Sequence, residues 1–395
     1  MKKNMTISFV GGILVSAGAL YFAFKNVPLT ELINYIASIN YFWVLPAVLV
    51  AVFSFMLRAV RWQIILESSC RMSFWRAFHP MMIGFMINCV LPGRLGEVAR
   101  PVILQKEEKV PFATGLATVV AERAFDICLL ILLFTLTAGA LKISPDQTVS
   151  FGTYQLNEET LQTVFDNLLK FGAVLLAGVA VFSVGKARNL IYSIILRTPA
   201  LFLFAGQPFK DTIRKRICEP IINILKNIAE GFALIRYPRK FFLCAGYSAL
   251  IWGLQACSYY LFSLGCPGIN LTYFEITTMM VIICFFISLP SVPGWWGLWE
   301  AGGVFALSLF GISAKDAAGF TLANHAIQVI PVILIGFVSA MILSVNIRRM
   351  SFEGKDLKVF SKEKLPIIVE YPDKKVVKKN VDSKGLKLEY SHVRD

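Results

Sequence analysis

The chain has 395 residues, of which 56% are hydrophobic and 16% charged, with a formal net charge of +14. Soluble domains carry about a quarter charged residues, and here the apolar residues fall in runs of roughly 18 or more. A soluble globular domain is therefore excluded. The basic residues lie between and after the apolar runs, so they indicate cytoplasmic loops and anionic lipid headgroups as partners, not nucleic acid.

Eight cysteines are scattered along the chain without paired spacing and without companion histidines. Most lie in apolar runs, where cysteine behaves as a small hydrophobic residue. The sequence therefore predicts no disulfide framework, no metal site and no cofactor.

The predicted elements are apolar helices separated by polar loops. The first helix, 5–24, follows Lys2 and Lys3, which place the N-terminus in the cytoplasm. The apolar segments that follow are 41–65, 77–92, 115–141, 168–185, 241–264, 272–289, 296–311 and 317–345. We predict an all-α, polytopic transmembrane helix bundle over 1–349, in the cytoplasmic (inner) membrane of the cell. Residues 350–395 form a basic tail that we expect to be cytoplasmic and partly disordered.

Charge bias in the loops sets the predicted orientation. Segment 185–240 holds eleven Lys and Arg against three acids, so it is predicted to be cytoplasmic. The loop 142–167 holds one Lys and four acids, so it is predicted to face outside. Within the cytoplasmic segment, 189–205 and 213–235 are expected to lie on the membrane surface, the second as an amphipathic helix.

Basic residues on both sides of 77–92 indicate a re-entrant hairpin. Both flanks favour the cytoplasm, and a single crossing of about sixteen residues cannot satisfy both. Pro92-Gly93 interrupts the helix, so we predict a hairpin over 77–104 that enters and leaves on the cytoplasmic side. The flanking basic residues are Arg71, Arg76, Arg94, Arg100, Lys106 and Lys109.

The other end of the chain leaves two topologies open. Residues 265–271 are expected outside and Arg348-Arg349 inside, which requires an odd number of crossings by 272–289, 296–311 and 317–345. Either all three segments cross, or the first two form an outward-opening hairpin joined at 290–294. The hairpin is favoured.

The two interruptions resemble each other. One reads Pro92-Gly93-Arg94-Leu95-Gly96-Glu97, and the other reads Pro293-Gly294-Trp295-Trp296-Gly297-Leu298-Trp299-Glu300. Interrupted apolar segments at corresponding positions of two halves are typical of inverted-repeat transporters, which bind substrate at the breaks. The residues predicted to make the breaks are Pro92, Gly93, Gly96, Pro293, Gly294 and Gly297.

Polar side chains in or beside the apolar segments are the candidate substrate-binding residues, because an ion at the centre of a membrane helix costs about 2.5–3.5 kcal/mol. The candidates are Arg58, Arg61, Asn88, Arg94, Glu97, Arg100, Glu122, Arg123, Asp126, Glu300 and His325. No catalytic residue is predicted.

Each candidate also has a structural interpretation. Arg58 and Arg61 can act as snorkelling anchors, and Glu122, Arg123 and Asp126 can form an ion-pair cluster at the interface. The residues around the first break suit an anionic headgroup, because free backbone N–H groups and arginine forks gather there. Glu300 has no basic neighbour in sequence, and His325 can simply hydrogen-bond a neighbouring helix.

These motifs together resemble the lysylphosphatidylglycerol synthase transmembrane, or flippase-like, family, over roughly 5–345. The resemblance implies a membrane bundle with re-entrant segments that translocates phospholipids or other lipid-linked molecules. The chain departs from the best-known members in two ways. Residues 350–395 are too few for a cytosolic aminoacyl-transferase domain, which indicates a stand-alone member, and Trp295 stands where a small residue is common.

The expected function is therefore lipid translocation between leaflets, without enzymatic activity. An ion-coupled solute transporter or channel remains an alternative, since it can use the same broken helices. A membrane-embedded transferase is less favoured, because the sequence has no P-loop, Gly-rich fingerprint or metal-ligand cluster. The expected partners are membrane lipids with an anionic, zwitterionic or polyprenyl-phosphate-linked headgroup, and a second copy of the chain is kept as a candidate partner.

Overall fold

The computed structural model describes residues 2–25, 27–67, 70–91, 94–137, 149–151, 154–156, 185–198, 238–289 and 292–344, with a few single residues between 163 and 222. Several predicted features lie outside the described residues. They are almost all of the apolar segment 168–185 and of the amphipathic segment 213–235, the whole tail 350–395, and the break residues Pro92 and Gly93.

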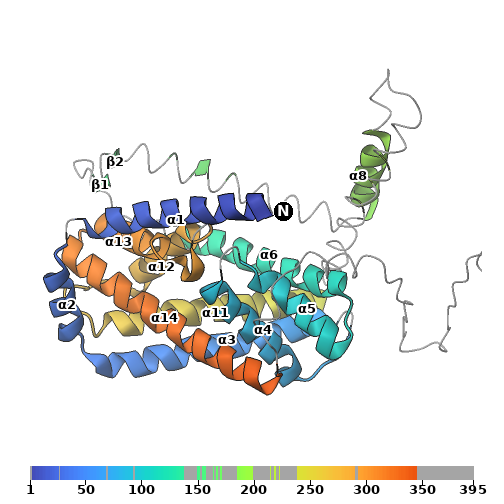
Figure 1. The fold of residues 1–395 in the computed structure, drawn as a ribbon, viewed down its shortest axis with the longest axis horizontal. Helices are drawn as coiled ribbons and strands as arrows, with labels where there is room; N and C mark the ends of the chain where they lie inside the picture. Colours follow the sequence, from blue (N-terminus) through green and yellow to red (C-terminus); the bar gives the residue numbers. More distant parts are fainter. Residues whose placement is uncertain are drawn as a thin grey trace, which may run out of the picture. The chain divides into compact units, whose positions relative to one another are not determined.

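The described chain is almost entirely helical, which confirms the all-α fold class (Figure 1). One short antiparallel hairpin, β1 (Val149–Phe151) and β2 (Tyr154–Leu156), pairs Ser150 with Gln155. The helices are α1 (Lys2–Phe24), α2 (Leu29–Ser38), α3 (Val44–Leu66) after the 3-10 turn η1 (Tyr41–Trp43), α4 (Phe74–Val90), α5 (Gly96–Glu108), α6 (Phe112–Thr137), α8 (Gly185–Arg197), α11 (Pro238–Ser263), α12 (Tyr273–Phe286), the 3-10 turn η6 (Pro293–Trp295), α13 (Leu298–Leu309) and α14 (Ala314–Ile342).

Three described helical segments are long and apolar enough to cross a membrane: Tyr41–Leu66, Pro238–Ser263 and Ala314–Ile342. A fourth span results if Ile13–Phe24 and Leu29–Ser38, which meet at 76°, count as one broken helix. Helix α6 has 26 residues and a length of about 39 Å, but it carries three charged side chains near its middle. Large apolar side chains cover the outward faces of α3 and α14, as expected of surfaces in contact with lipid.

Helix α2 has no counterpart among the predicted segments. It begins directly after Pro28 and buries Leu32 and Tyr35. The Tyr35 hydroxyl donates a hydrogen bond to the Pro267 carbonyl (3.0 Å), and its ring lies against Gly319 of α14. The helix was missed because ten residues are too few to register as a crossing.

Helices α4 and α5 form a hairpin. At the end away from the break, an ion pair joins the start of α4 to the end of α5, with Arg76 Nη1 3.2 Å from Glu108 Oε2. Near the break, Gly84 and Gly96 bring the two backbones into close contact, and the Asn88 side chain accepts a hydrogen bond from the Gly96 amide (2.8 Å). The helices have 17 and 13 residues, or about 26 and 20 Å. Neither can cross a hydrocarbon core of about 30 Å alone.

Helices α12 and α13 form a second hairpin, with Gly302 of α13 packed on Ile283 and Phe286 of α12. They have 14 and 12 residues, or about 21 and 18 Å, so neither spans a bilayer core. These lengths agree with the favoured alternative, in which this pair of segments does not make two full crossings.

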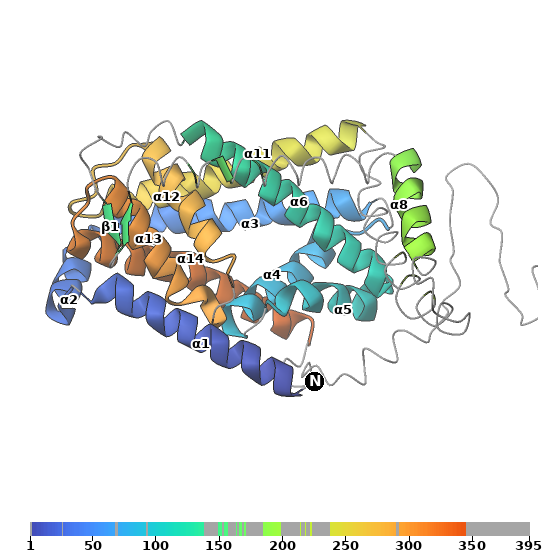
Figure 2. The same cartoon turned by 90° about the horizontal axis from the view of Figure 1, so that it is seen from above.

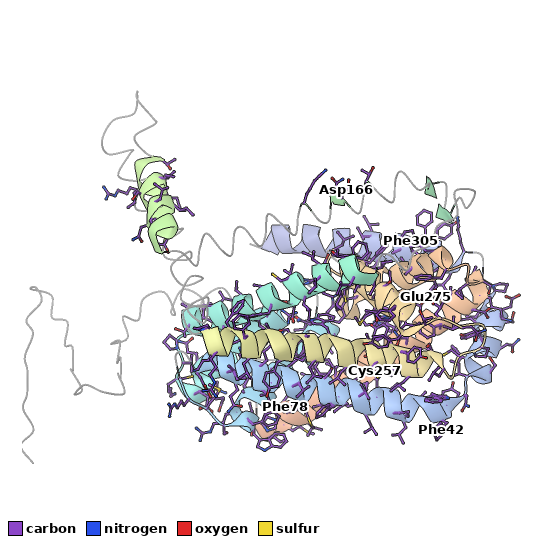
Figure 3. All side chains as sticks on the ribbon, turned by 180° about the vertical axis from the view of Figure 1, so that it is seen from behind. Phe42, Phe78, Asp166, Cys257, Glu275 and Phe305 are labelled. Carbon is purple, nitrogen blue, oxygen red and sulfur yellow. The ribbon has the colours of Figure 1, made fainter. Side chains whose placement is uncertain are left out.

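Helix α14 runs past both hairpins, which pack on opposite halves of it. Its first half contacts α13 through Thr321, which lies against Gly303. Its second half contacts α4, with Gly336 against Met86 and Ser339 hydrogen-bonded to His79 (3.1 Å). Figures 1 and 2 show α12 and α13 toward one end of α14 and α4 and α5 toward the other. Figure 3 likewise shows Phe78 of α4 apart from Glu275 of α12 and Phe305 of α13.

The two interruptions meet near the middle of α14. Gly294 lies beside the Cys89 carbonyl, and Arg94 Nη2 donates to the Ile287 carbonyl at the end of α12 (2.6 Å). Arg94 and Trp295, which each follow a Pro-Gly pair, have left-handed φ values of 54° and 59°. A positive φ is uncommon for residues other than glycine. The two interruptions thus share a rare conformation at corresponding positions, while the internal repeat stays a prediction.

The hairpin geometry leads to a labelling prediction. In a cysteine-free background, single cysteines at Arg76 and Lys106, whose side chains are exposed, should react with a membrane-impermeant maleimide from the same side. A cysteine at the exposed Asn270, between α11 and α12, should react from the other side. Labelling of positions 76 and 106 from opposite sides would make α4 and α5 an ordinary crossing.

Gly96→Ala should lower the free energy of unfolding, because its added methyl group would strike the Gly84 carbonyl and the Asn88 side chain. Overpacking of this kind costs about 1–3 kcal/mol. Thermal unfolding in detergent measures the effect. The matched control is Gly246→Ala on α11, where nothing lies within 4 Å and the change raises helix propensity. Equal stability of both variants would contradict the close backbone contact in this hairpin.

Candidate functional site

A network of charged side chains lies buried between α3, α5, α6 and α11. Each helix supplies its members from one face: Arg58 and Arg61 are one turn apart on α3, and Glu122 and Asp126 are one turn apart on α6. Arg61, Arg100 and Glu122 are almost completely inaccessible to solvent. Arg58 and Arg61 therefore do not snorkel to an interface, which was one of their two sequence interpretations.

Arg61 is the centre of this buried network. Its Nη1 donates to Asp126 Oδ1 (2.7 Å) and to Ser248 Oγ of α11 (2.6 Å), and its Nη2 donates to Glu122 Oε1 (3.1 Å). The second oxygen of Glu122 accepts from Arg100 Nη2 of α5 (2.6 Å). The network thus joins four helices, of which α5 and α6 are consecutive while α3 and α11 lie more than 160 residues apart in sequence.

Three guanidinium groups gather around one pair of aromatic rings, Phe55 and Phe85, whose centroids are 5.3 Å apart. Arg58 lies 5.8 Å from the Phe55 ring, while Arg100 and Arg123 lie 5.6 and 5.9 Å from the Phe85 ring. Like charges repel when they converge in a medium of low dielectric constant, so the three guanidinium groups need negative charge close by, which Asp126, Glu122 and Glu97 supply in part.

Aromatic and hydrogen-bonding partners hold these arginines in place. The Arg100 guanidinium lies 4.1 Å from the Trp62 ring, and the indole N–H of Trp62 donates to Thr118 Oγ1 (3.0 Å). Arg58 lies 4.9 Å from the Trp252 ring, whose N–H donates to Asp126 Oδ1 (3.1 Å). The cations are therefore held by cation–π contacts as well as by carboxylates.

The network reaches the surface at Glu97 and Arg123. Their side chains are about a third exposed, at 30% and 31%, and lie 3.5 Å apart, while Arg123 also lies 3.5 Å from Asp126. This pair connects the buried network with the outside of the bundle, so it is where a polar group can approach.

Positive charge exceeds negative charge in the network. Within the described residues, the guanidinium groups of Arg58, Arg61, Arg100 and Arg123 face the three carboxylates of Glu97, Glu122 and Asp126. Several buried N–H groups also have no acceptor among the described residues, namely Arg58 Nε, Arg61 Nε, Arg100 Nε and Arg100 Nη1. One acceptor of the network, Asp126 Oδ2, is likewise without a hydrogen-bond partner among the described residues. Since buried polar groups are normally satisfied, the network has one excess positive charge and more unpaired donors than acceptors.

A second polar cluster lies at the outer break. Glu300 of α13 and His325 of α14 are fully buried, with Glu300 Oε1 2.6 Å from His325 Nδ1. Glu300 Oε2 accepts from the Gly297 amide (2.6 Å), and His325 Nε2 lies 2.8 Å from the Gly294 carbonyl. Glu300 therefore has a partner that its sequence neighbourhood did not reveal.

The candidate residues thus fall into two clusters and two hairpin contacts. Arg58, Arg61, Glu97, Arg100, Glu122, Arg123 and Asp126 form the network, and Glu300 and His325 form the outer pair. Asn88 and Arg94 belong to the breaks themselves, where Asn88 accepts from the Gly96 amide and Arg94 donates to the Ile287 carbonyl. Five further side chains hold the charged groups and were not predicted from the sequence: Trp62, Ser248, Trp252, Trp296 and Trp299. Trp62, Trp296 and Trp299 lie within one turn of a charged residue in sequence, whereas no such signal marks Ser248 and Trp252.

The class of protein is now defined: a polytopic α-helical membrane protein with a buried charged network and two opposed helical hairpins. The chain matches the family model of the lysylphosphatidylglycerol synthase TM region over residues 9–336, so it belongs to that family. The expected resemblance is confirmed.

Two curated relatives are distant. Glycosyltransferase AglD of Haloferax volcanii is 23% identical over 367 residues, which is 86% of this chain and 55% of that protein. A UPF0104 membrane protein of Methanothermobacter thermautotrophicus is 25% identical over 308 residues, covering 76% of this chain and 83% of that protein. The chain therefore spans little more than half the length of the named glycosyltransferase.

Proposed function

We propose that this protein translocates a lipid with a phosphate-bearing headgroup between the two leaflets of the cytoplasmic membrane, with both termini in the cytoplasm. The observation that carries the proposal is the buried network, which has excess positive charge and unused guanidinium N–H groups. Such a network is costly to bury, and a phosphate group would satisfy both the charge and the donors.

Arg100, Arg58 and Arg123 are the proposed headgroup ligands, because they surround the Phe55–Phe85 pair. The headgroup reaches them past the partly exposed Glu97–Arg123 pair. Arginine suits this role because its planar fork matches phosphate and stays charged. The acyl chains remain in the surrounding lipid, against the apolar outer faces of the bundle.

The opposed hairpins provide the proposed route across the membrane. Because they open toward opposite ends of α14 and meet at its middle, small movements of either break can expose the central region to one side at a time. Arg94 links the two breaks through the Ile287 carbonyl. We therefore assign Arg94 a positioning role between the hairpins, rather than the shared docking role with Arg100 that its sequence position suggested.

Two other functions predict different results. An ion-coupled solute transporter or channel would move a small polar solute through the same breaks without moving lipid. The name of AglD raises glycosyl transfer, which would instead consume a sugar donor. We propose that the chain itself is not an enzyme, since the network has paired charges in place of an identifiable nucleophile.

The test is a reconstituted vesicle assay. Fluorescent analogues of phosphatidylglycerol, phosphatidylethanolamine, a polyprenyl phosphate and a phosphate-free diacylglycerol glycolipid are placed in one leaflet, and a membrane-impermeant quencher reports their movement. We expect faster movement of at least one phosphate-bearing lipid than in protein-free vesicles, and no acceleration of the phosphate-free lipid. No acceleration of any lipid, or equal acceleration of all four, would contradict the proposal.

A further inference from the structure

The Glu300–His325 pair has a hydrogen-bonding pattern that requires a bound proton. His325 Nε2 lies 2.8 Å from the Gly294 carbonyl, which can only accept, so Nε2 carries a hydrogen. His325 Nδ1 lies 2.6 Å from Glu300 Oε1. A neutral imidazole with its hydrogen on Nε2 offers only a lone pair at Nδ1, and a carboxylate also offers only lone pairs. The contact therefore contains one further proton, either on Nδ1 or on Oε1.

Both members of the pair also hold the strained turn at the outer break. Gly294, Trp295 and Gly297 have left-handed φ values of 70°, 59° and 89°. His325 holds the carbonyl of Gly294, and Glu300 holds the amide of Gly297. Loss of the shared proton would leave two lone pairs facing each other at one of the His325 contacts, either with Glu300 Oε1 (2.6 Å) or, after a change of tautomer, with the Gly294 carbonyl (2.8 Å), and would weaken the hold on this turn.

Two tryptophans enclose the pair. The Trp299 ring is stacked on the His325 ring with centroids 4.5 Å apart, and the Trp296 ring lies 4.4 Å away. An indole face stabilises a cationic ring, and the pair is fully buried. These rings shield the proton from water and also report on its presence, since indole emission responds to a neighbouring charge.

We propose that Glu300 and His325 form a proton-binding site that holds the outer hairpin break closed when loaded and releases it when empty. The proton is taken up from water onto Glu300 Oε1 or His325 Nδ1 and returned to water on release. The second part of the proposal rests on the proposed lipid translocation: the same site makes the proton the coupling ion for the movement of lipid.

The titratable and charged groups on neighbouring elements do not form ion pairs with Glu300 or His325, so the bound proton is assigned to this pair. Tyr259 of α11 stacks on Trp299, Cys89 of α4 lies with its carbonyl beside Gly294, and Tyr35 of α2 packs on Gly319. The charged group that approaches from the inner hairpin is Arg94, which is bonded to the Ile287 carbonyl. Among the ion pairs of the described residues, neither Glu300 nor His325 is paired with a lysine or an arginine.

The first experiment measures tryptophan emission of the purified full chain as the pH is varied over the range in which the protein stays folded. We expect one single-proton step in wild type. Glu300→Gln should remove it, because a glutamine amide donates permanently to His325 Nδ1 and its oxygen still accepts from Gly297. His325→Gln should remove it as well. Melting temperatures confirm that each variant is folded.

The matched control is Glu275→Gln. Glu275 caps α12 much as Glu300 caps α13, accepting from the Thr272 amide (2.7 Å), but it is only partly buried and its carboxylate has no histidine partner among the described residues. This variant should keep the step. Absence of a step in wild type, or an unchanged step in both Glu300→Gln and His325→Gln, would overturn the proposed site.

The second experiment adds a pH gradient to the lipid vesicle assay. We expect the gradient to change the wild-type and Glu275→Gln rates at least several-fold and to leave the Glu300→Gln rate unchanged. A wild-type rate of lipid movement that is the same with and without the pH gradient would overturn the proposed coupling. A proton step in a protein that moves no lipid would contradict the proposed function and leave the proton site standing.

Discussion

Replacing Glu122 with glutamine should lower the free energy of unfolding by about 3–5 kcal/mol, because it leaves buried guanidinium groups without their carboxylate. Glu122 is fully buried and binds both Arg61 and Arg100. Its loss would raise the existing excess of positive charge in the network. Thermal unfolding in detergent, with a phosphate-free buffer, measures the effect.

The control for this change is Glu108→Gln, which breaks the Arg76–Glu108 pair at the open end of the inner hairpin. There the Arg76 side chain is 65% exposed, and exposed ion pairs contribute at most about 1 kcal/mol. If Glu122→Gln were no more destabilising than Glu108→Gln, the buried network would not be the electrostatic centre of the fold.

Arg100→Gln should affect activity more than stability, unlike Glu122→Gln: we expect the protein to stay folded and lipid translocation to fall about 10- to 100-fold. The variant removes the excess positive charge, and Glu122 keeps its bond to Arg61, so we expect a smaller loss of stability than for Glu122→Gln. A charge-assisted hydrogen bond to the headgroup is lost, which at about 1.5–3 kcal/mol corresponds to this change in rate. The initial rate of leaflet exchange in vesicles is the measurement.

Arg100→Lys separates charge from geometry in the same assay. Lysine keeps the positive charge but loses the fork and the stacking on Trp62, so its rate should fall between those of wild type and Arg100→Gln. If Arg100→Gln had full activity and a normal melting temperature, Arg100 would not bind the headgroup and the role of the network would be purely structural.

Much of the fold could be predicted from the sequence because membrane insertion depends on local composition. The apolar segments at 41–65, 241–264 and 317–345 correspond to helices α3, α11 and α14. The hairpin at α4–α5 followed from basic residues on both flanks of a segment too short for two crossings. Helix α2 did not follow, because it packs on Pro267 and Gly319 through contacts more than 200 residues distant in sequence.

The sequence marked out the charged residues of the candidate site, whose role stays a prediction, but it did not indicate how they are arranged. Glu122 and Asp126 were expected on one face of a helix, since their spacing is local. Their pairing with Arg61 spans more than 60 residues, and that of Glu300 with His325 spans 25. Such contacts depend on how helices pack, which spacing along one chain does not encode. The unused donors that motivate the proposed function are visible only once that packing is known.

Native mass spectrometry of the purified protein tests most directly whether the network binds a lipid headgroup. The wild-type protein, extracted in mild detergent, should retain a phosphate-bearing lipid, and Arg76→Gln, which alters an exposed arginine outside the network, should retain the same lipid. Arg100→Gln should lose most of it while remaining folded. Equal lipid occupancy in wild type and Arg100→Gln, or wild-type protein that retains only phosphate-free lipids, would contradict the account.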